Sequence, residues 1–386
     1  MLRSLSDGIS GLRAHQTMLD VTGNNIANVN TTGFKSSSVQ FQDSLSQVLR
    51  ASSLPQEQAG GRNPAQIGLG VQVAGIRTNF AQGSTQSTGV PTDLMLDGDG
   101  FFVVRKGGEN VYTRNGGFSF DAAGRLTSAD GALVQGWTAQ NGVLNTGGLL
   151  GGITLPIGAT SAAVETTEAT VTGNLPSTAA VGDEIVREIT VYDETGTAST
   201  LSLTFTRTAA GWDVADGAGG TTSLAFTDGK LTAPASLVSG GVTVDLSTVT
   251  GYADLRTIKV DNQNGNAAGT LLSYQITGDG SLIGTFSNGA TEVLAQIAVA
   301  TFDNPEGLEK AGSSQYRVGV NSGNPVLSTA GADGGGAIIS GALEMSNVDL
   351  SQEFTNLIVA QRGFQSNARV ITTSDEILQE VTNLKR

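Results

Sequence analysis

Residues 2–28 read LRSLSDGISGLRAHQTMLDVTGNNIAN, and their apolar residues recur with the period of an amphipathic helix. The stripe consists of Leu2, Leu5, Ile9, Leu12, Leu19 and Ile26, with Gln16 and Gly23 at the remaining positions of the same face. Spacings that alternate between three and four residues are typical of a coiled-coil seam. The open alternative is an ordinary amphipathic helix that packs on the core of its own domain.

A second helical stretch runs from Leu350 to the end of the chain, with Ser346 and Asp349 as candidate N-cap residues. Polar Gln361 and Asp375 interrupt its main stripe, which holds Leu350, Phe354, Leu357, Phe364, Ala368, Ile371 and Leu378. A shifted stripe continues with Ile377, Val381 and Leu384. The chain is therefore expected to carry long helices at both ends.

The apolar stripe of residues 2–28 is too small to stabilise a helix alone. Each large apolar side chain contributes roughly 1.5–3 kcal/mol when fully buried. Ordering the backbone costs about 1–2 kcal/mol per residue before hydrogen bonds compensate. We therefore predict that both ends of the chain are disordered in a free monomer and fold between subunits.

The stretch GNNIANVNTTGF at residues 23–34 is uncharged and rich in amides and hydroxyls. We expect its asparagines to bond to backbone or to one another, and Gly33 to end the helix with a positive φ. The predicted subunit-interface residues are Leu2, Leu5, Ile9, Leu12, Leu19, Asn24, Asn25, Ile26, Asn28, Phe354, Leu357, Phe364, Ile371, Leu378, Val381 and Leu384.

The composition excludes several functions. The net charge of −14 disfavours a nucleic-acid partner. There is no Cys, and His15 is the single histidine, expected at a surface or interface rather than as a ligand. No apolar run is long enough for membrane insertion, and the N-terminus lacks the apolar region of a cleaved signal peptide. The sequence predicts no enzyme activity and no catalytic, cofactor-binding or metal site.

The fold class expected is mainly β with long α-helical termini, in an elongated, nested multi-domain subunit. Residues 1–30 plus 350–386 form a helical coiled-coil assembly domain, the inner tube. Residues 31–75 form an extended linker with a short helical piece around Val39–Val48. Residues 76–145 plus 278–349 form a middle β domain, with turn signals at Asn115-Gly116 and Asp130-Gly131. Residues 146–277 form an outer β domain inserted in the middle one.

The chain resembles the bacterial flagellar axial proteins, the family of rod, hook and hook–filament junction subunits. The resemblance lies in LDVTGNNIANVNTTGFKSS at residues 19–37 and in residues 346–386, and extends to DGDGFFVVR at residues 97–105. Within this family, the central insert, the opening MLRSL and the ending NLKR favour the hook type of subunit. The shorter distal rod type, and outside the family a secreted β-rich carbohydrate-binding protein or enzyme, remain alternatives.

The resemblance implies a self-assembling structural protein. Its subunits form a helical homopolymer, a curved and flexible tube that serves as a universal joint in bacterial motility and encloses the export channel. The implied partners are a distal rod protein, a hook cap, a hook–filament junction protein and the flagellar type III export apparatus. The implied location is the extracellular flagellum at its basal body, reached with the N-terminus uncleaved.

Overall fold

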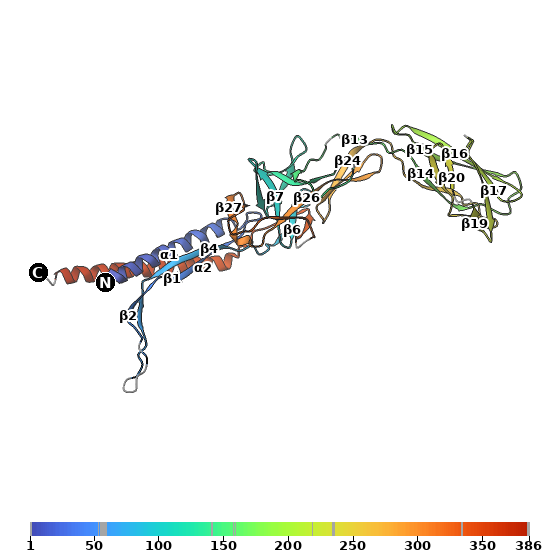
Figure 1. The fold of residues 1–386 in the computed structure, drawn as a ribbon. Coiled ribbons are helices and arrows are strands. Elements are labelled where there is room, and N and C mark those ends of the chain that lie inside the picture. Colours follow the sequence, from blue (N-terminus) through green and yellow to red (C-terminus); the bar gives the residue numbers. More distant parts are fainter. Residues whose placement is uncertain are drawn as a thin grey trace. The chain divides into compact units, whose positions relative to one another are not determined.

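The structure is a computed structural model that describes residues 2–383, apart from 53, 55–59, 140, 141, 157, 159, 218, 234, 235, 333 and 334. The chain forms two compact units (Figure 1). Unit 1 comprises Met1–Leu155, Gln275–Leu282 and Val293–Arg386, and unit 2 comprises Pro156–Tyr274 and Ile283–Glu292. Unit 1 is therefore built from segments on both sides of unit 2. The finer division into four segments stays a prediction.

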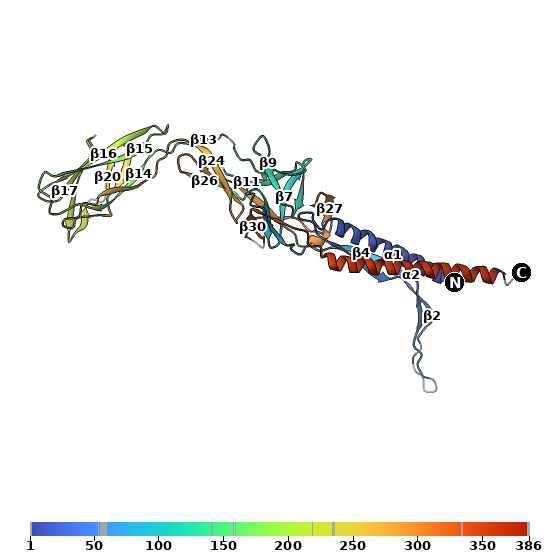
Figure 2. The same ribbon diagram turned by 180° about the vertical axis from the view of Figure 1, so that it is seen from behind.

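Two long helices, α1 (Leu2–Ala27) and α2 (Leu350–Asn383), lie side by side in unit 1 (Figures 1 and 2). Asp349 caps α2, because its Oδ1 accepts the backbone N–H of Ser351 at 2.8 Å. After α1 ends, Gly33 has a φ of 66°, a conformation that glycine adopts without strain. The predicted cap and the predicted positive φ are both confirmed. In the described part of the chain, neither helix is long and apolar enough to cross a membrane.

Four strands follow α1 and form two nested antiparallel pairs. Strand β1 (Ser37–Asp43) pairs antiparallel with β4 (Val71–Thr78), and β2 (Ser46–Arg50) pairs antiparallel with β3 (Ala65–Gly68). The helical piece predicted around Val39–Val48 is therefore wrong. Val39 and Phe41 alternate with polar residues, which is the side-chain period of a strand. The backbone of this segment pairs with β4. Strands β1 and β4 pack on α1, so part of the predicted linker covers the helix.

The rest of unit 1 is a β body whose strands come from both sides of unit 2. The strands before unit 2 are β5 (Thr85–Ser87), β6 (Leu94–Asp97), β7 (Phe101–Lys106), β8 (Glu109–Thr113), β9 (Phe118–Phe120), β10 (Leu126–Ser128), β11 (Leu133–Thr138) and β12 (Gly151–Gly152). Those after it are β27 (Glu309–Gly312), β28 (Gln315–Arg317), β29 (Val326–Thr329), β30 (Ala337–Ser340) and β31 (Ala342–Glu344), with a 3-10 turn at Pro305–Gly307. Early and late strands pair as β5 with β31, β6 with β30 and β8 with β28.

Strand β7 lies at the centre of this body and is buried on both faces. Phe101 and Val103 belong to a cluster with Tyr112 and Trp137. The intervening Phe102 packs edge-on against Phe118, with ring centroids 5.2 Å apart. Because successive side chains of a strand point to opposite faces, the run FFVV contributes to the core on both sides. Strand β26 (Thr291–Thr301) pairs with β7, β11 and β29, and β25 is Ser281–Phe286.

The two turn signals behave differently. Asp130-Gly131 lies in the turn between the paired strands β10 and β11, with Gly131 at a φ of 81°. Asn115-Gly116 joins β8 to β9. In the described structure these two strands do not pair with each other, and β9 pairs with β10. A Cβ on Gly116 would collide with the carbonyl of Leu94, so glycine is required there by a close backbone approach. The prediction of a hairpin turn at Asn115-Gly116 is wrong.

Unit 2 is a β domain around its own core. Its strands are β13 (Thr160–Ser161), β14 (Glu168–Asn174), β15 (Glu184–Tyr192), β16 (Ala198–Arg207), β17 (Trp212–Ala215), β18 (Thr221–Thr227), β19 (Lys230–Ala233), β20 (Ser236–Ser239), β21 (Val242–Asp245), β22 (Val249–Thr250), β23 (Lys259–Gln263) and β24 (Gly269–Ile276). Alternate residues of β15 and β16, such as Ile185, Ile189, Leu203 and Phe205, enter the core. The predicted class, mainly β with long terminal helices, is confirmed.

Candidate functional site

Small residues form the seam between α1 and α2. A Cβ built on Gly11 would lie 2.6 Å from Asn367 Oδ1, and one built on Gly8 would lie 3.0 Å from Ile371 Cγ1. The His15 ring packs where a side chain on Gly363 would stand. Pairing of early residues in α1 with late residues in α2 makes the pair antiparallel. At Gly8 and Gly11 the absence of a side chain lets the two helices approach closely.

The predicted stripe on α1 lies beside this seam. Ser4 also belongs to the seam, because its Oγ lies 3.4 Å from Ser374 Oγ. Leu5, Ile9 and Leu12 stand one position later than Ser4, Gly8 and Gly11, which is a rotation of about 100° around the helix. Ile9 is 39% exposed, whereas Leu5, Leu12, Leu19 and Ile26 are half-buried. The side chain of Leu2 lies outside the described part of the structure. The apolar residues of the first turns of α1 are therefore offset from the glycines that contact α2.

On α2, the predicted residues divide into two groups. Leu357, Ile371 and Leu378 are half-buried on the side that faces α1, where Ile371 meets Gly8. Phe354, Phe364 and Val381 are exposed, at 52%, 38% and 48%. Leu384 lies outside the described residues. The part these residues play in subunit contacts stays a prediction.

The exposed apolar residues of α2 occupy both flanks of the seam. At about 100° per residue, Phe354 and Ile358 lie to one side of the residues that contact α1. Further along, Val370, Ile377 and Val381 lie to the other side. Each of the five is at least two-fifths exposed. The helix pair thus presents apolar surface in two directions at once.

The asparagines at the end of α1 have separate roles. Asn28 Nδ2 donates to the backbone oxygen and to Oδ1 of Asn24, both at 2.9 Å, and so caps the helix. Buried Asn25 accepts the N–H of Ser37 at 3.0 Å and donates to its carbonyl at 2.7 Å. Asn25 Nδ2 also donates to Glu353 Oε1 at 3.0 Å. Asn25 therefore links α1 to β1 and to α2. Its two bonds to the backbone of Ser37 agree with the expectation that the asparagines bond to backbone.

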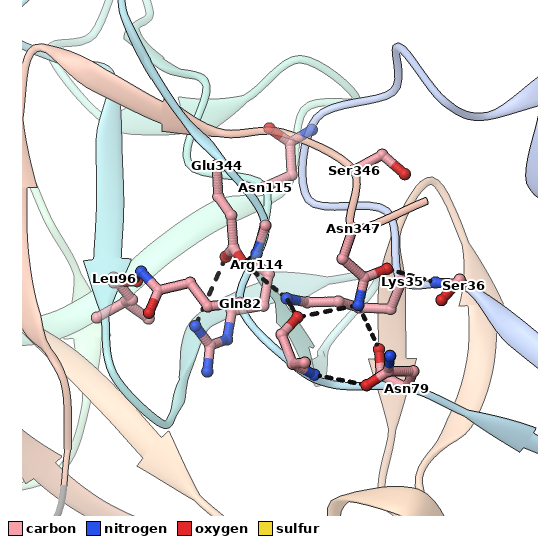
Figure 3. A network of polar contacts seen from close by, with 12 residues as sticks. Lys35, Ser36, Asn79, Gln82, Leu96, Arg114, Asn115, Glu344, Ser346 and Asn347 are labelled. Atoms are coloured by element: carbon pink, nitrogen blue, oxygen red, sulfur yellow. Dashed lines mark hydrogen bonds and ion pairs between the residues drawn. The ribbon is translucent and has the colours of Figure 1, made fainter. Parts of the chain in front are cut away.

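A buried ion network lies directly after this stretch (Figure 3). Lys35 Nζ is 2.6 Å from Glu344 Oε1 and donates to the carbonyl of Ala81 at 2.8 Å. The same Oε1 accepts the N–H of Gly83 at 2.8 Å, and Arg114 Nη1 is 3.5 Å from Glu344 Oε2. The side chains of Lys35 and Glu344 are wholly buried, and that of Arg114 is 3% exposed.

Burial dominates the electrostatics of this network. It lowers the pKa of Lys35, and the attraction of Glu344 opposes that shift. Burial also lowers the pKa of Arg114 against the same carboxylate. One carboxylate therefore serves two desolvated cations. Such a network contributes structural specificity more than net stability, because desolvation offsets much of the attraction.

The network fixes the junction between the helix pair and the β body of unit 1. Lys35 follows α1, Glu344 ends β31 and Arg114 follows β8. Asn347, just before α2, accepts the N–H of Ser36 and donates to the carbonyl of Asn79, both at 2.8 Å (Figure 3). No spacing in the sequence predicts this network. Its one local signal is that Lys35 is the first charge after an uncharged stretch.

Comparison with known proteins matches three family models to the same regions. The model of the flagella basal body rod protein matches residues 6–35. That of the flagellar hook protein FlgE/F/G D1 domain matches residues 95–171. That of the flagellar basal body rod FlgEFG protein C-terminal matches residues 339–384. The chain belongs to the FlgE/FlgF/FlgG family of structural flagellar hook and basal-body rod proteins, as predicted.

Among individual proteins, the chain is 37% identical to the flagellar hook protein FlgE of Treponema pallidum, with all of both chains covered. It is 36% identical to FlgE of Salmonella typhimurium, covering 99% of this chain and 100% of that protein. It is also 36% identical to the basal-body rod protein FlgG of Bacillus subtilis, with both fully covered. The crystal structure of Helicobacter pylori hook protein FlgE2 has a similar fold, with a TM-score of 0.50, 15% identity, and 67% of this chain and 100% of that chain covered.

Proposed function

We propose that this chain is the structural subunit of the flagellar hook. Its copies form a helical tube that encloses an export channel and acts as a curved universal joint. Several full-length relatives are named flagellar hook protein, which favours the hook over the distal rod. Family membership weighs against the alternative of a secreted carbohydrate-binding protein or enzyme, and the chain has no catalytic role in this proposal.

The observation that carries the proposal is the uncovered apolar surface of the helix pair. The seam holds small and polar residues of α1 against Asn367 and Ile371 of α2, whereas Phe354, Ile358 and Val381 remain about half exposed. Burying a large apolar side chain contributes roughly 1.5–3 kcal/mol. Helices of neighbouring copies are the matching surface, because they carry the same stripes. The stripe on α1 from Leu5 to Ile26 then forms part of the contacts between subunits.

The proposal also includes the wider assembly. The distal rod protein, the hook cap and the hook–filament junction protein are its partners. The subunit leaves the cell through the flagellar type III apparatus without cleavage of its N-terminus. Membership of a family of flagellar axial proteins supports these expectations, and detection of the intact N-terminus on isolated hooks by mass spectrometry tests the last of them.

Hydrogen exchange on the full chain tests the assembly role. In dilute solution the amides of residues 2–28 and 350–383 should exchange rapidly, and in the polymer they should be protected. Electron microscopy of the polymer should show curved tubes, and a chain lacking residues 2–28 should stay monomeric. Strong protection of both helices in the monomer would refute the argument. Straight tubes would favour the distal rod alternative.

A further inference from the structure

Unit 1 contains a pocket of about 460 Å³ that the helix pair and the ion network do not explain. Asn24, Asn28 and Thr31 line it from the end of α1. Lys310 and the turn between β27 and β28 form another part of its wall. The pocket is therefore continuous with the end of α1, whose neighbouring residues belong to the proposed subunit contact.

Lys310 brings an unneutralised positive charge to this wall. Its Nζ donates to Ser37 Oγ at 2.8 Å and lies 5.6 Å from the centre of the Phe34 ring. Among the described residues, no carboxylate lies within ion-pairing distance of it. Desolvation lowers the pKa of Lys310, which is the effect of partial burial without a counter-charge.

The turn beside Lys310 is strained. Ser313 and Ser314 have φ values of 52° and 55°, in a two-residue turn that normally uses Asn and Gly. Residues other than glycine are disfavoured in this conformation, and such backbone strain is typical of functional positions. Ser313 and Ser314 line the pocket, and their hydroxyls donate no hydrogen bond within the described part of the chain. They are therefore available to a ligand.

We propose that this pocket receives a carboxylate side chain from a second copy of the chain, with Lys310 as its counter-ion and the Ser313–Ser314 turn as its hydrogen-bond donors. Asn24 adds a further donor, because its amide nitrogen is unused among the described residues while its Oδ1 accepts from Asn28. The inference rests on the proposed function, since it assigns a specific contact within the polymer.

The remaining charges of the pocket agree with this assignment. Asp130 also lines the wall, but Lys106 Nζ lies 2.6 Å from its Oδ2, and Ser128 and Gln315 donate to it. That carboxylate is neutralised within unit 1, so Lys310 leaves the wall with excess positive charge. An acidic chain supplies many carboxylates and few cations, and a second copy therefore provides the matching charge.

Carbodiimide coupling of the assembled protein tests the contact directly. The reagent joins an amine to a carboxylate in contact with it as an amide, and the carboxylate oxygen that leaves is carried away as a urea. Tubes grown from mixed 15N-labelled and unlabelled copies should yield hybrid peptides that link Lys310 to an Asp or Glu. The monomer should yield none. Coupling at other lysines without any at Lys310, or equal coupling in the monomer, would overturn the inference.

Substitutions provide an independent measure. Lys310→Gln should raise the critical concentration for polymerisation about tenfold, because a hydrogen bond to a charged group is lost. Lys310→Arg should retain most of the wild-type behaviour, and Lys259→Gln, an exposed lysine of unit 2, is the matched control. Urea unfolding of the monomeric variant measures the loss of the intramolecular bond to Ser37 Oγ, and the effect on polymerisation should exceed that loss. Normal polymerisation of Lys310→Gln would sink this inference alone, whereas absence of polymer from the wild-type chain would sink the proposed function with it.

Discussion

Replacing Glu344 by Gln should destabilise unit 1 more than replacing Lys35 by Met, and both changes should exceed Arg77→Met by far. The ion pairs Lys35–Glu344 and Arg77–Glu306 have the same N–O distance of 2.6 Å. The first is wholly buried, whereas the side chains of the second are 58% and 42% exposed. The comparison therefore isolates the effect of burial on a contact of fixed length.

The magnitudes follow from what each change leaves behind. Removing one partner of a buried ion pair costs about 3–5 kcal/mol, and an exposed pair contributes about 0–1 kcal/mol. Glu344→Gln leaves two buried cations without a carboxylate, so the upper end of the range applies. Lys35→Met leaves Glu344 with Arg114 and the Gly83 N–H, which places it near the lower end. Arg77→Met should change stability by less than about 1 kcal/mol.

Urea unfolding of the full chain provides the assay. Trp137, which is 5% exposed in unit 1, reports the transition by fluorescence in a Trp212→Phe background. Trp212 belongs to the core of unit 2, so the reciprocal background reports the unit that should stay unchanged. A loss for Arg77→Met as large as that for Lys35→Met would refute the argument from burial. If Glu344→Gln lowered the stability of unit 1 least among the three variants, the assignment of one carboxylate to two cations would be wrong.

Further predictions concern the seam, acid stability and unit 2. Gly11→Leu should separate α1 from Asn367 and abolish polymerisation in light-scattering assays, whereas Gly23→Ala, with open space around it within the subunit, should raise helicity without separating the two helices. The pKa of Asp130 is lowered from 3.8 to about 2, since hydrogen bonds from Lys106, Ser128 and Gln315 outweigh desolvation. Its contribution is therefore present above pH 4 and lost as the pH falls towards 2, and Asp130→Asn should flatten that part of a stability–pH curve. Deleting residues 146–277 should leave polymerisation in place and straighten the tubes seen by electron microscopy, and complete loss of polymer would contradict the separate role of the insert.

The helices could be predicted because apolar spacing leaves a periodic signal, and the nesting because segments of similar character flank a central insert of different composition. Apolar spacing placed two helices within a few residues of their observed bounds, and the end of α1 followed from glycine and asparagine chemistry. The small residues Gly8 and Gly11 suit close approach by a neighbouring helix, as the sequence indicates. They carry no hydrophobic signal, so the sequence does not identify α2 and Asn367 as that neighbour. Their role depends on how closely another helix approaches, which is a property of the assembled structure.

The ion network could not be predicted from the sequence for a similar reason. Lys35, Arg114 and Glu344 lie far apart in the sequence and have no spacing that relates them. Burial of a charge is decided by strand pairing between distant segments, such as β5 with β31. The strand β1 was missed because its apolar residues are few, and its pairing with β4 outweighed a weak local pattern.

The bond between Lys35 and Glu344 joins positions 309 residues apart. Closing a flexible loop of that length costs about 5 kcal/mol of chain entropy by the logarithmic rule. A ribosome-bound chain that has not reached Glu344 leaves Lys35 without its counter-ion, and such a fragment gains nothing by burying the lysine. Maturation of unit 1 is thereby deferred until translation is nearly finished, and truncated products should remain sensitive to proteases.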